Sequence, residues 1–152
     1  PMGSHTSCAQ QFPISARRAG GFPERAKPGI MAGTLEAGER MAAQTVFDRI
    51  LQGELPARVV YEDEHVLAFH DRQPQAPVHV LVIPKGQYTN ILQFNQNASS
   101  DEKLGLLDAI SQTAGIMGVD ESGFRLVSNT GHDGGQTVPH LHVHLMGGEH
   151  VQ

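Results

Sequence analysis

The chain has 152 residues, of which 39% are hydrophobic, 18% charged and 5% aromatic, and its formal net charge is −5 at neutral pH. This length predicts one domain. The acidic balance and the few aromatic residues argue against a nucleic-acid partner, and no apolar run is long enough to span a membrane. Because Cys8 is the single cysteine, no disulfide can form within the chain, as is usual in a cytoplasmic protein.

Residues 1–42 differ in composition from the rest of the chain. They contain turn-forming glycine, proline and serine without apolar periodicity, which predicts an extension of low order. Residues 1–5 resemble the remnant of an expression tag. Residues 1–40 also bear a weak likeness to an organellar presequence, which rests on the arginines Arg17, Arg18 and Arg25. We expect the folded domain in residues 43–152, where six basic residues stand against thirteen acidic ones.

The domain is expected to open with a short helix and three strands. Thr45 is a plausible N-cap with Asp48 three residues later, and Gly53 is a plausible stop, which places the helix at residues 45–51. Runs of β-branched and aromatic residues then predict three strands. The third is apolar on both faces except at His79; the expected strands are residues 59–61, 66–70 and 78–83.

A long helix and two further strands complete the domain. Ser99 and Glu102 form a capping box, after which apolar residues recur at helical spacing up to Gly118. This stripe is expected to face the core; its members are Leu104, Leu107, Ile110, Ala114 and Met117. Two more strands are expected at residues 124–128 and 138–146. Two helices with mostly consecutive strands predict an α+β fold with a five-stranded meander sheet.

The last strand carries three histidines that alternate with aliphatic residues. Because side chains alternate between the faces of a strand, His140, His142 and His144 are expected to point to one side. Three interpretations are open: half-exposed histidines satisfied by backbone groups, a metal site, or nucleophilic catalysis by an imidazole whose tautomer is set by its neighbours. Cys8 is too distant in the chain to support the metal site.

The loop before this strand, residues 129–137, is rich in glycine and hydrogen-bond donors. Glycine lets backbone N–H groups approach an anion closely, and Gln136 and Thr137 add side-chain donors. An ordinary tight turn would explain the glycines equally well, and the spacing is not that of a Walker A loop. A phosphate site beside a row of histidines nevertheless favours attack on phosphorus.

Two separated motifs resemble the histidine-triad family of nucleotide hydrolases and transferases, and in particular its nucleoside phosphoramidase branch. The first comprises LAFHD at residues 67–71 and PQAPVHVLVIPK at residues 74–85, and the second is GQTVPHLHVHLMGG at residues 135–148. The likeness extends over residues 45–148. It implies a five-stranded antiparallel sheet, one long helix and one short helix, and a homodimer joined through the long helix and a sheet edge.

The resemblance also implies catalytic roles. His142 matches the nucleophile that attacks the α-phosphorus of a nucleotide and forms a covalent nucleotidyl-histidine, which water then hydrolyses. His140 and His144 match the histidines that orient the nucleophile and contact the phosphate, and His144 also helps to protonate the leaving group. His79 matches a fourth histidine that supports the triad from a neighbouring strand.

Binding roles follow from the same resemblance. Asp71 matches the carboxylate that accepts both ribose hydroxyls, a role that suits a group with acceptors only. The phosphate-binding positions are Asn129, Gly135, Gln136, Thr137 and the backbone of Val138. The apolar slot around the base is expected to consist of Phe47, Ile50, Phe69 and Leu81.

The implied function is that of a purine nucleoside phosphoramidase, which hydrolyses the P–N bond between AMP or GMP and an amine without a metal or another cofactor. Other functions stay open: a dinucleoside polyphosphate hydrolase, a nucleotide-binding regulatory module with little turnover, and a zinc-binding interaction protein. Three departures bear on this choice. Thr137 stands where the phosphoramidases usually have serine, Pro139 resembles the polyphosphate hydrolase branch, and the sequence reaches Gln152 without the tryptophan-containing tail of the closest relatives.

Overall fold

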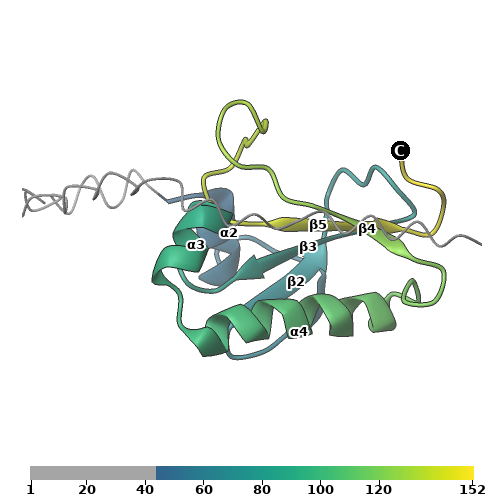
Figure 1. The fold of residues 1–152 in the computed structure, drawn as a ribbon, viewed down its shortest axis with the longest axis horizontal. Coiled ribbons are helices and arrows are strands. Elements are labelled where there is room, and N and C mark those ends of the chain that lie inside the picture. The colour runs from purple at the N-terminus through teal and green to yellow at the C-terminus, as the bar shows by residue number, and fades with distance from the viewer. Residues whose placement is uncertain (1–43) are drawn as a thin grey trace, which may run out of the picture.

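The computed structural model describes residues 44–152, and it contains a five-stranded antiparallel sheet with helices on both sides (Figure 1). The expectations for residues 1–42 lie outside the described residues. In chain order the elements are α2 (Val46–Leu51), β1 (Val59–Glu62), β2 (Val66–His70), β3 (Val78–Pro84), α3 (Ile91–Asn97), α4 (Ser100–Ile116), β4 (Phe124–Val127) and β5 (Val143–Gly147). The α+β fold with an antiparallel sheet is therefore confirmed.

The two central strands β2 and β3 bury side chains on both of their faces. Val66, Ala68, Val80 and Val82 belong to the main core beneath α4, while the alternate residues of the same strands belong to a second cluster around Phe47 of α2. This arrangement follows from the period of two along a strand. The sheet therefore has an α4 face that forms the core and an α2 face that is open to a site.

The capping predictions for the first and last helices are confirmed. The Thr45 hydroxyl accepts the backbone N–H of Asp48 at the start of α2, and the Ser99 hydroxyl accepts that of Glu102 at the start of α4. Gly53 follows the C-cap of α2 with a φ of 76°, in the left-handed region that glycine adopts at helix ends. No helix within residues 44–152 has the length and apolar character to cross a membrane.

The helix α3 was not predicted. It covers seven residues, and Phe94 is the one residue in it that is buried, so its apolar pattern is too short to reveal a period. Its start is nevertheless well defined, because the side chain of Asn90 accepts the backbone N–H groups of Leu92 and Gln93.

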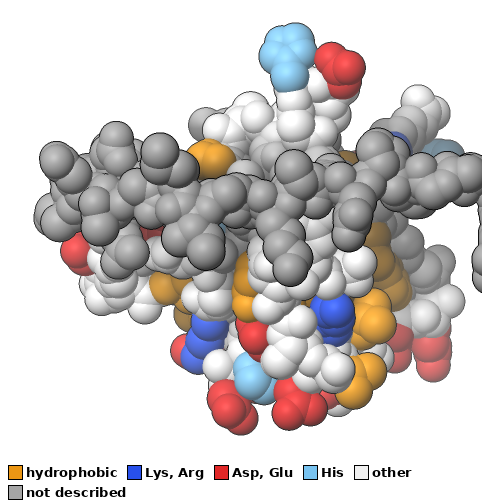
Figure 2. All heavy atoms as spheres, turned by 60° about the vertical axis from the view of Figure 1, so that its left-hand side comes forward, with side chains coloured by type: hydrophobic (Ala, Val, Ile, Leu, Met, Phe, Trp, Pro, Cys, Tyr) orange, Lys and Arg blue, Asp and Glu red, His pale blue; other side chains and the backbone are white. Residues whose placement is uncertain are grey.

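The prediction that Leu104 and Leu107 belong to the core was wrong. They are 65% and 66% exposed. The same prediction is confirmed for Ile110 and Ala114, which are buried on the sheet together with Leu106, Ala109 and Thr113. Gly105 helps to explain which face of α4 packs on the sheet. A Cβ there would stand 3.3 Å from His65, so a small residue is needed where the helix approaches that closely. Other hydrophobic side chains also reach the surface, and Figure 2 shows several on one side of the molecule.

The order of the last two strands departs from a simple meander. The sheet order is β1-β2-β3-β5-β4, because the chain passes from β3 through both helices to the edge strand β4 and then returns to insert β5 beside β3. β5 also begins later than expected. It starts at Val143, so His140 and His142 precede it. The pairing with β3 ends here because Pro84 of β3 has no N–H to donate and because the N–H of Leu141 binds the carbonyl of Tyr88 at 2.7 Å.

Candidate active site

A cavity of about 740 Å³ opens on the α2 face of the sheet. Apolar side chains from α2, β2 and β3 form one wall, and Asp71, Thr137, His142 and His144 form the polar part. The cavity brings together nine of the residues predicted for the site: Phe47, Ile50, Phe69, Asp71, Leu81, Thr137, Val138, His142 and His144. One apolar wall facing a few converging polar groups is the usual form of a small-molecule site.

His142 is held in a single orientation by its own chain segment. Its Nδ1 lies 2.7 Å from the backbone carbonyl oxygen of His140, and because a carbonyl only accepts, Nδ1 carries the hydrogen. The lone pair is therefore on Nε2. The side chain is buried, with its ring centroid 5.0 Å from that of Phe47. Burial lowers the pKa of His142, although the carbonyl of His140 opposes this shift, so the imidazole is neutral at pH 7 and can act as a nucleophile.

A chain of hydrogen bonds defines the tautomer of His144 in the same way. The backbone N–H of Gln75 donates to Nδ1 of His79 at 3.0 Å, so His79 carries its hydrogen on Nε2. That Nε2 lies 2.9 Å from Nδ1 of His144, which therefore accepts. His144 is left with an N–H at Nε2. The pKa of His144 is lowered, mainly by burial and to a smaller extent by the neighbouring His142 and His79.

Asp71 lies at the polar end of the cavity beside His79. One of its carboxylate oxygens accepts the backbone N–H of Gln73 at 2.7 Å, and the other lies 3.4 Å from Nε2 of His79. Because the side chain is partly exposed and lines the cavity, its remaining acceptor capacity is available to a ligand.

Within residues 44–152, Asp71, His79 and His144 approach the geometry of a metal site, with ligand atoms within 4.8 Å of one another. Their hydrogen bonds do not suit a metal. Since Gln75 donates to Nδ1 of His79, the nitrogen of His79 that faces the group already carries hydrogen and has no lone pair to offer. An ion would have to displace that hydrogen and break the bond to His144, so we assign no metal to this cluster.

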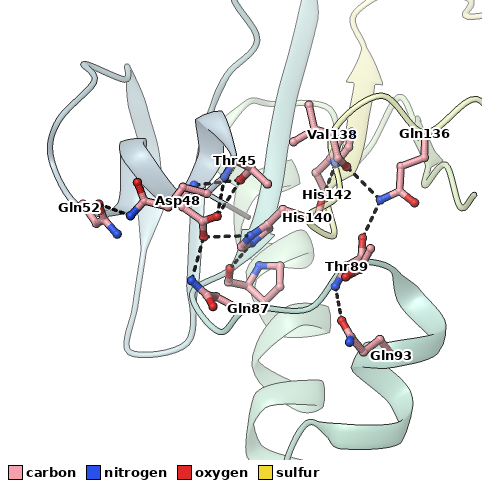
Figure 3. Close-up of polar contacts among 12 residues, drawn as sticks. Thr45, Asp48, Gln52, Gln87, Thr89, Gln93, Gln136, Val138, His140 and His142 are labelled. Atoms are coloured by element: carbon pink, nitrogen blue, oxygen red, sulfur yellow. Dashed lines mark hydrogen bonds and ion pairs between the residues drawn. The ribbon is translucent and has the colours of Figure 1, made fainter. Parts of the chain in front are cut away.

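His140 lies behind the cavity and does not line it. The side chain is 2% exposed, with Nε2 3.0 Å from the carbonyl oxygen of Pro84 and Nδ1 3.5 Å from a carboxylate oxygen of Asp48 (Figure 3). Sequence reasoning found Asp48 only as the partner of Thr45 in the cap of α2. Its contact with His140 joins residues 92 positions apart in the chain, and a capping motif carries no signal for such a contact.

The predicted phosphate loop divides into residues that face a cavity and residues that do not. Thr137 and Val138 line the main cavity, and Asn129 lines a second, adjacent one together with His79, Thr137 and His144. Gln136 and Gly135 line neither. The side-chain amide of Gln136 donates to the carbonyls of Thr89 and Val138, at 2.6 and 2.9 Å, and so connects the loop to the segment before α3 (Figure 3).

Glycine has a clear steric role in this loop at one position. A Cβ at Gly134 would stand 2.3 Å from the carbonyl oxygen of Thr130, so any other residue would force the turn open. The carbonyl of Gly134 in turn accepts the side-chain amide of Asn129 at 2.7 Å. The loop is therefore a folded unit whose polar side chains first satisfy its own backbone.

The cavity also contains residues that sequence reasoning missed. Two of them are cations, Arg58 and Arg72, and the others are Val46, Pro56, Ala57, His70 and Pro74. Arg72 directly follows Asp71 in the sequence, which could have indicated its place, but its guanidinium donates to the carbonyl of Pro56 at 3.0 Å. Arg58 gave no local signal.

Comparison with known proteins identifies relatives for most of the described chain. The family model of the HIT domain matches residues 52–151 of the sequence. An uncharacterised HIT-like protein of Azospirillum brasilense is 49% identical over 106 residues, which cover 70% of this chain and 87% of that protein. The purine nucleoside phosphoramidase of Escherichia coli K12 is 42% identical over 112 residues, which cover 71% and 90%.

Solved structures similar to this one also belong to histidine triad and HIT family proteins. A histidine triad protein from Clostridium difficile has a TM-score of 0.65 and 40% identity, covering 70% of this chain and 92% of that one. A HIT family hydrolase from Legionella pneumophila has a TM-score of 0.64 and 42% identity, covering 72% and 96%. The sheet and its helices therefore form a fold that these proteins share.

Proposed function

This chain belongs to the HIT-domain family, and we propose that within it the protein is a purine nucleoside phosphoramidase. The reaction would be hydrolysis of the P–N bond in AMP or GMP joined to an amine. The name of the Escherichia coli relative and its 42% identity support this choice of substrate. The observation that carries the proposal is the orientation of His142, whose Nδ1 is engaged by a backbone carbonyl while the ring lines the cavity with Nε2 as its nucleophilic atom.

In the first step, Nε2 of His142 uses its lone pair to form a bond to the α-phosphorus, and the P–N bond of the substrate breaks. The electron pair of that bond goes to the departing nitrogen, which takes up a proton beside Thr137 and His144. Solvent supplies this proton, while the Nε2–H of His144, the donor defined by the hydrogen bonds from Gln75 and His79, orients the departing nitrogen through a hydrogen bond and keeps its own hydrogen. The product is an amine and a nucleotidyl-histidine.

In the second step, water attacks the same phosphorus and the bond to Nε2 breaks, with its electron pair returning to His142. A proton of the water passes to solvent, which balances the one taken up earlier. Throughout, the carbonyl of His140 holds the Nδ1–H of His142, so the ring stays aligned for both displacements.

The remaining cavity residues are assigned to binding. The carboxylate of Asp71 would accept the ribose hydroxyls, and the apolar wall formed by Phe47, Ile50, Phe69 and Leu81 would contact the purine. Thr137 and the backbone of Val138 would hold the phosphate. Asn129, Gly135 and Gln136 would shape the loop that positions them, since two of these side chains already bind loop carbonyls.

The test compares two substrates with and without a chelator. Purified protein is assayed on an AMP–amine conjugate and on diadenosine triphosphate, each with and without EDTA. We expect a higher kcat/KM for the conjugate and no effect of EDTA. A preference for the dinucleotide would favour the polyphosphate hydrolase indicated by Pro139, and activity that EDTA removes and zinc restores would favour a metal mechanism.

A further inference from the structure

The two ring nitrogens of His140 both face hydrogen-bond acceptors. Nε2 lies 3.0 Å from the carbonyl oxygen of Pro84, at the end of β3. Nδ1 lies 3.5 Å from Oδ1 of Asp48, on α2, as Figure 3 shows for the side chains of Asp48 and His140. A neutral imidazole has one N–H, so it can satisfy only one of these acceptors. His140 is 2% exposed, and an acceptor facing a lone pair in such a buried place would be destabilising.

The carboxyl group of Asp48 is surrounded by hydrogen-bond donors. The side chain is buried, and one carboxylate oxygen accepts the N–H and the hydroxyl of Thr45, at 2.8 and 3.1 Å. The other oxygen faces the amide of Gln87 at 3.5 Å as well as His140. All of these partners are donors. A carboxylic acid would have to turn its own O–H toward one of them, whereas a carboxylate accepts from all.

We propose that Asp48 is a positioning residue that holds His140 as an imidazolium, with hydrogen on both ring nitrogens, directly behind His142. The catalytic part of this inference rests on the proposed function. The groups that face the His140 ring include the carboxylate of Asp48 from α2, the carbonyl of Pro84 from β3 and the ring of Phe47 from α2. His142, in the same segment, binds the backbone carbonyl of His140. Asp48 is the one carboxylate among them.

A cation at this position would affect the reaction in two ways. The carbonyl of His140 binds Nδ1 of His142 at 2.7 Å, and both side chains are buried, so the positive charge belongs to the residue two positions before the nucleophile. It would stabilise negative charge as it develops on the phosphoryl oxygens. It would also disfavour a second charge on the nucleophile, and a charged His140 is among the influences that lower the pKa of His142.

The direct test is the protonation of His140 itself, measured by ¹⁵N NMR of the histidine side chains at pH 7. His140→Gln identifies the His140 signals by their loss. We expect two protonated ring nitrogens in the wild type, and a neutral ring with hydrogen on one nitrogen in Asp48→Asn, which removes the charge and keeps the shape. A neutral His140 in the wild type, or a ring unchanged in Asp48→Asn, would overturn the proposal. The wild-type measurement needs no variant to fold.

The kinetic test uses the pH profile of kcat/KM. In Asp48→Asn we expect a loss of about 10- to 100-fold at the plateau, as is typical when a residue that orients a functional histidine is changed. The acid limb should also move to higher pH, because loss of the nearby positive charge raises the pKa of His142. KM should change little, since neither Asp48 nor His140 lines the cavity.

Two control variants separate charge from structure. Gly53→Ala strains the C-terminal end of α2, because Gly53 has a φ of 76°, but it keeps the Asp48 carboxylate and all of its donors. Asp63→Asn changes a carboxylate that accepts the N–H groups of His65 and Val66 away from the cavity. Both should keep the wild-type acid limb. If Gly53→Ala reproduces the shifted limb, Asp48 acts only through the helix and the proposal fails. If the protein cleaves no phosphoramidate, the proposed function fails while the NMR comparison still decides the state of His140.

Discussion

At the scale of single residues, backbone groups decide the chemistry of the histidines. A free imidazole exchanges its hydrogen between two nitrogens, but His142 and His79 each have one nitrogen bound to a group of fixed polarity. The carbonyl of His140 can only accept, and the N–H of Gln75 can only donate. These two contacts give adjacent histidines opposite roles: His142 offers a lone pair at Nε2 and His144 offers an N–H.

The nucleophile can be removed without dismantling the binding site. In His142→Asn we expect hydrolysis to fall to background, because the variant lacks the ring nitrogen that is proposed to attack the phosphorus. Binding of AMP should persist, because Asp71, Thr137 and the apolar wall remain. Rapid-quench assays for turnover and calorimetry for AMP binding measure the two effects separately. Near-normal turnover in this variant would contradict covalent catalysis by His142.

The pH dependence follows from the direction of two pKa shifts. Burial lowers the pKa of both His142 and His144, so these groups charge in the folded protein at a lower pH than in the unfolded chain. The reactive form of His142 is neutral; kcat/KM should therefore stay level from pH 8 to below about 6.5 and then fall as the pH approaches the lowered pKa. An acid limb of kcat/KM that lies above pH 6.5 would contradict the assignment of His142 as the neutral nucleophile.

The same shifts predict a loss of stability in acid. Between the lowered pKa and about 6.5, the unfolded chain binds protons that the native state does not, so the free energy of unfolding should fall as the pH falls through this range. Above the unfolded pKa of about 6.5 neither state binds these protons, and this loss of stability is absent. Urea midpoints measured at pH 8 and pH 5 for wild type and for His144→Phe, which cannot be protonated, would show a smaller decrease in the variant.

The ribose contact gives a prediction about binding. In Asp71→Asn one acceptor oxygen becomes a donor group of nearly the same size, so the ligand loses a charge-assisted hydrogen bond. We expect AMP binding to weaken by roughly 1.5–3 kcal/mol. The matched comparison is 2′,3′-dideoxy-AMP, which should bind wild type and variant alike. Equal binding of the two nucleotides by the wild type would show that Asp71 does not hold the ribose.

At the scale of helices and strands, the sequence is most informative where the structure is local. The caps at Thr45 and Ser99 and the doubly apolar strands β2 and β3 could be predicted, because a cap spans three residues and a strand alternates with a period of two. The contact between Asp48 and His140 could not, since it depends on where α2 docks. The insertion of β5 between β3 and β4 likewise depends on pairing between distant segments.

The buried face of α4 was predicted only in part, at Ile110 and Ala114, for a related reason. Counting large apolar residues selected Leu104 and Leu107, whereas close packing on the sheet selected a neighbouring stripe with Ala109 and Thr113. Size and hydrophobicity are properties of one residue, but the face that packs is decided by how closely two surfaces can approach. The triad could be recognised from its alternation, although the regular strand begins only at Val143.

Thr113 in α4 gives a prediction about stability. Its hydroxyl is fully buried and is the one buried side-chain polar atom in residues 44–152 without a hydrogen-bond partner. Thr113→Val keeps the shape and removes the unsatisfied group, which should raise the free energy of unfolding by about 1 kcal/mol. Thr113→Ser, which keeps the hydroxyl and loses the methyl group, should lower it. Urea unfolding of both variants measures the difference, and a Val variant no more stable than wild type would mean that the hydroxyl is satisfied.

At the scale of the whole molecule, apolar side chains remain exposed on α4 and on the edge strand β4. Leu104, Leu107 and Ile116 are all more than half exposed, and Phe124 and Leu126 of β4 are 38% and 45% exposed. β4 also lies at the edge of the sheet, so one side of its backbone is unpaired within residues 44–152. Exposed leucines on a long helix together with an open strand edge are typical of a surface that pairs with a second copy.

We therefore keep the homodimer as a prediction and place its test on α4. In a symmetric interface each substitution occurs twice, so Leu107→Asp should weaken association by about 2 kcal/mol for each buried aspartate and yield a monomer at micromolar concentration. Leu92→Asp is the matched control, because Leu92 is 63% exposed on α3 and should not affect association. Sedimentation velocity gives the mass of each species, and circular dichroism checks that the variants fold. A monomeric wild type, or a Leu107→Asp protein that stays dimeric, would contradict the prediction. Because the cavity is on the α2 face and α4 covers the opposite one, the monomeric variant should still bind AMP.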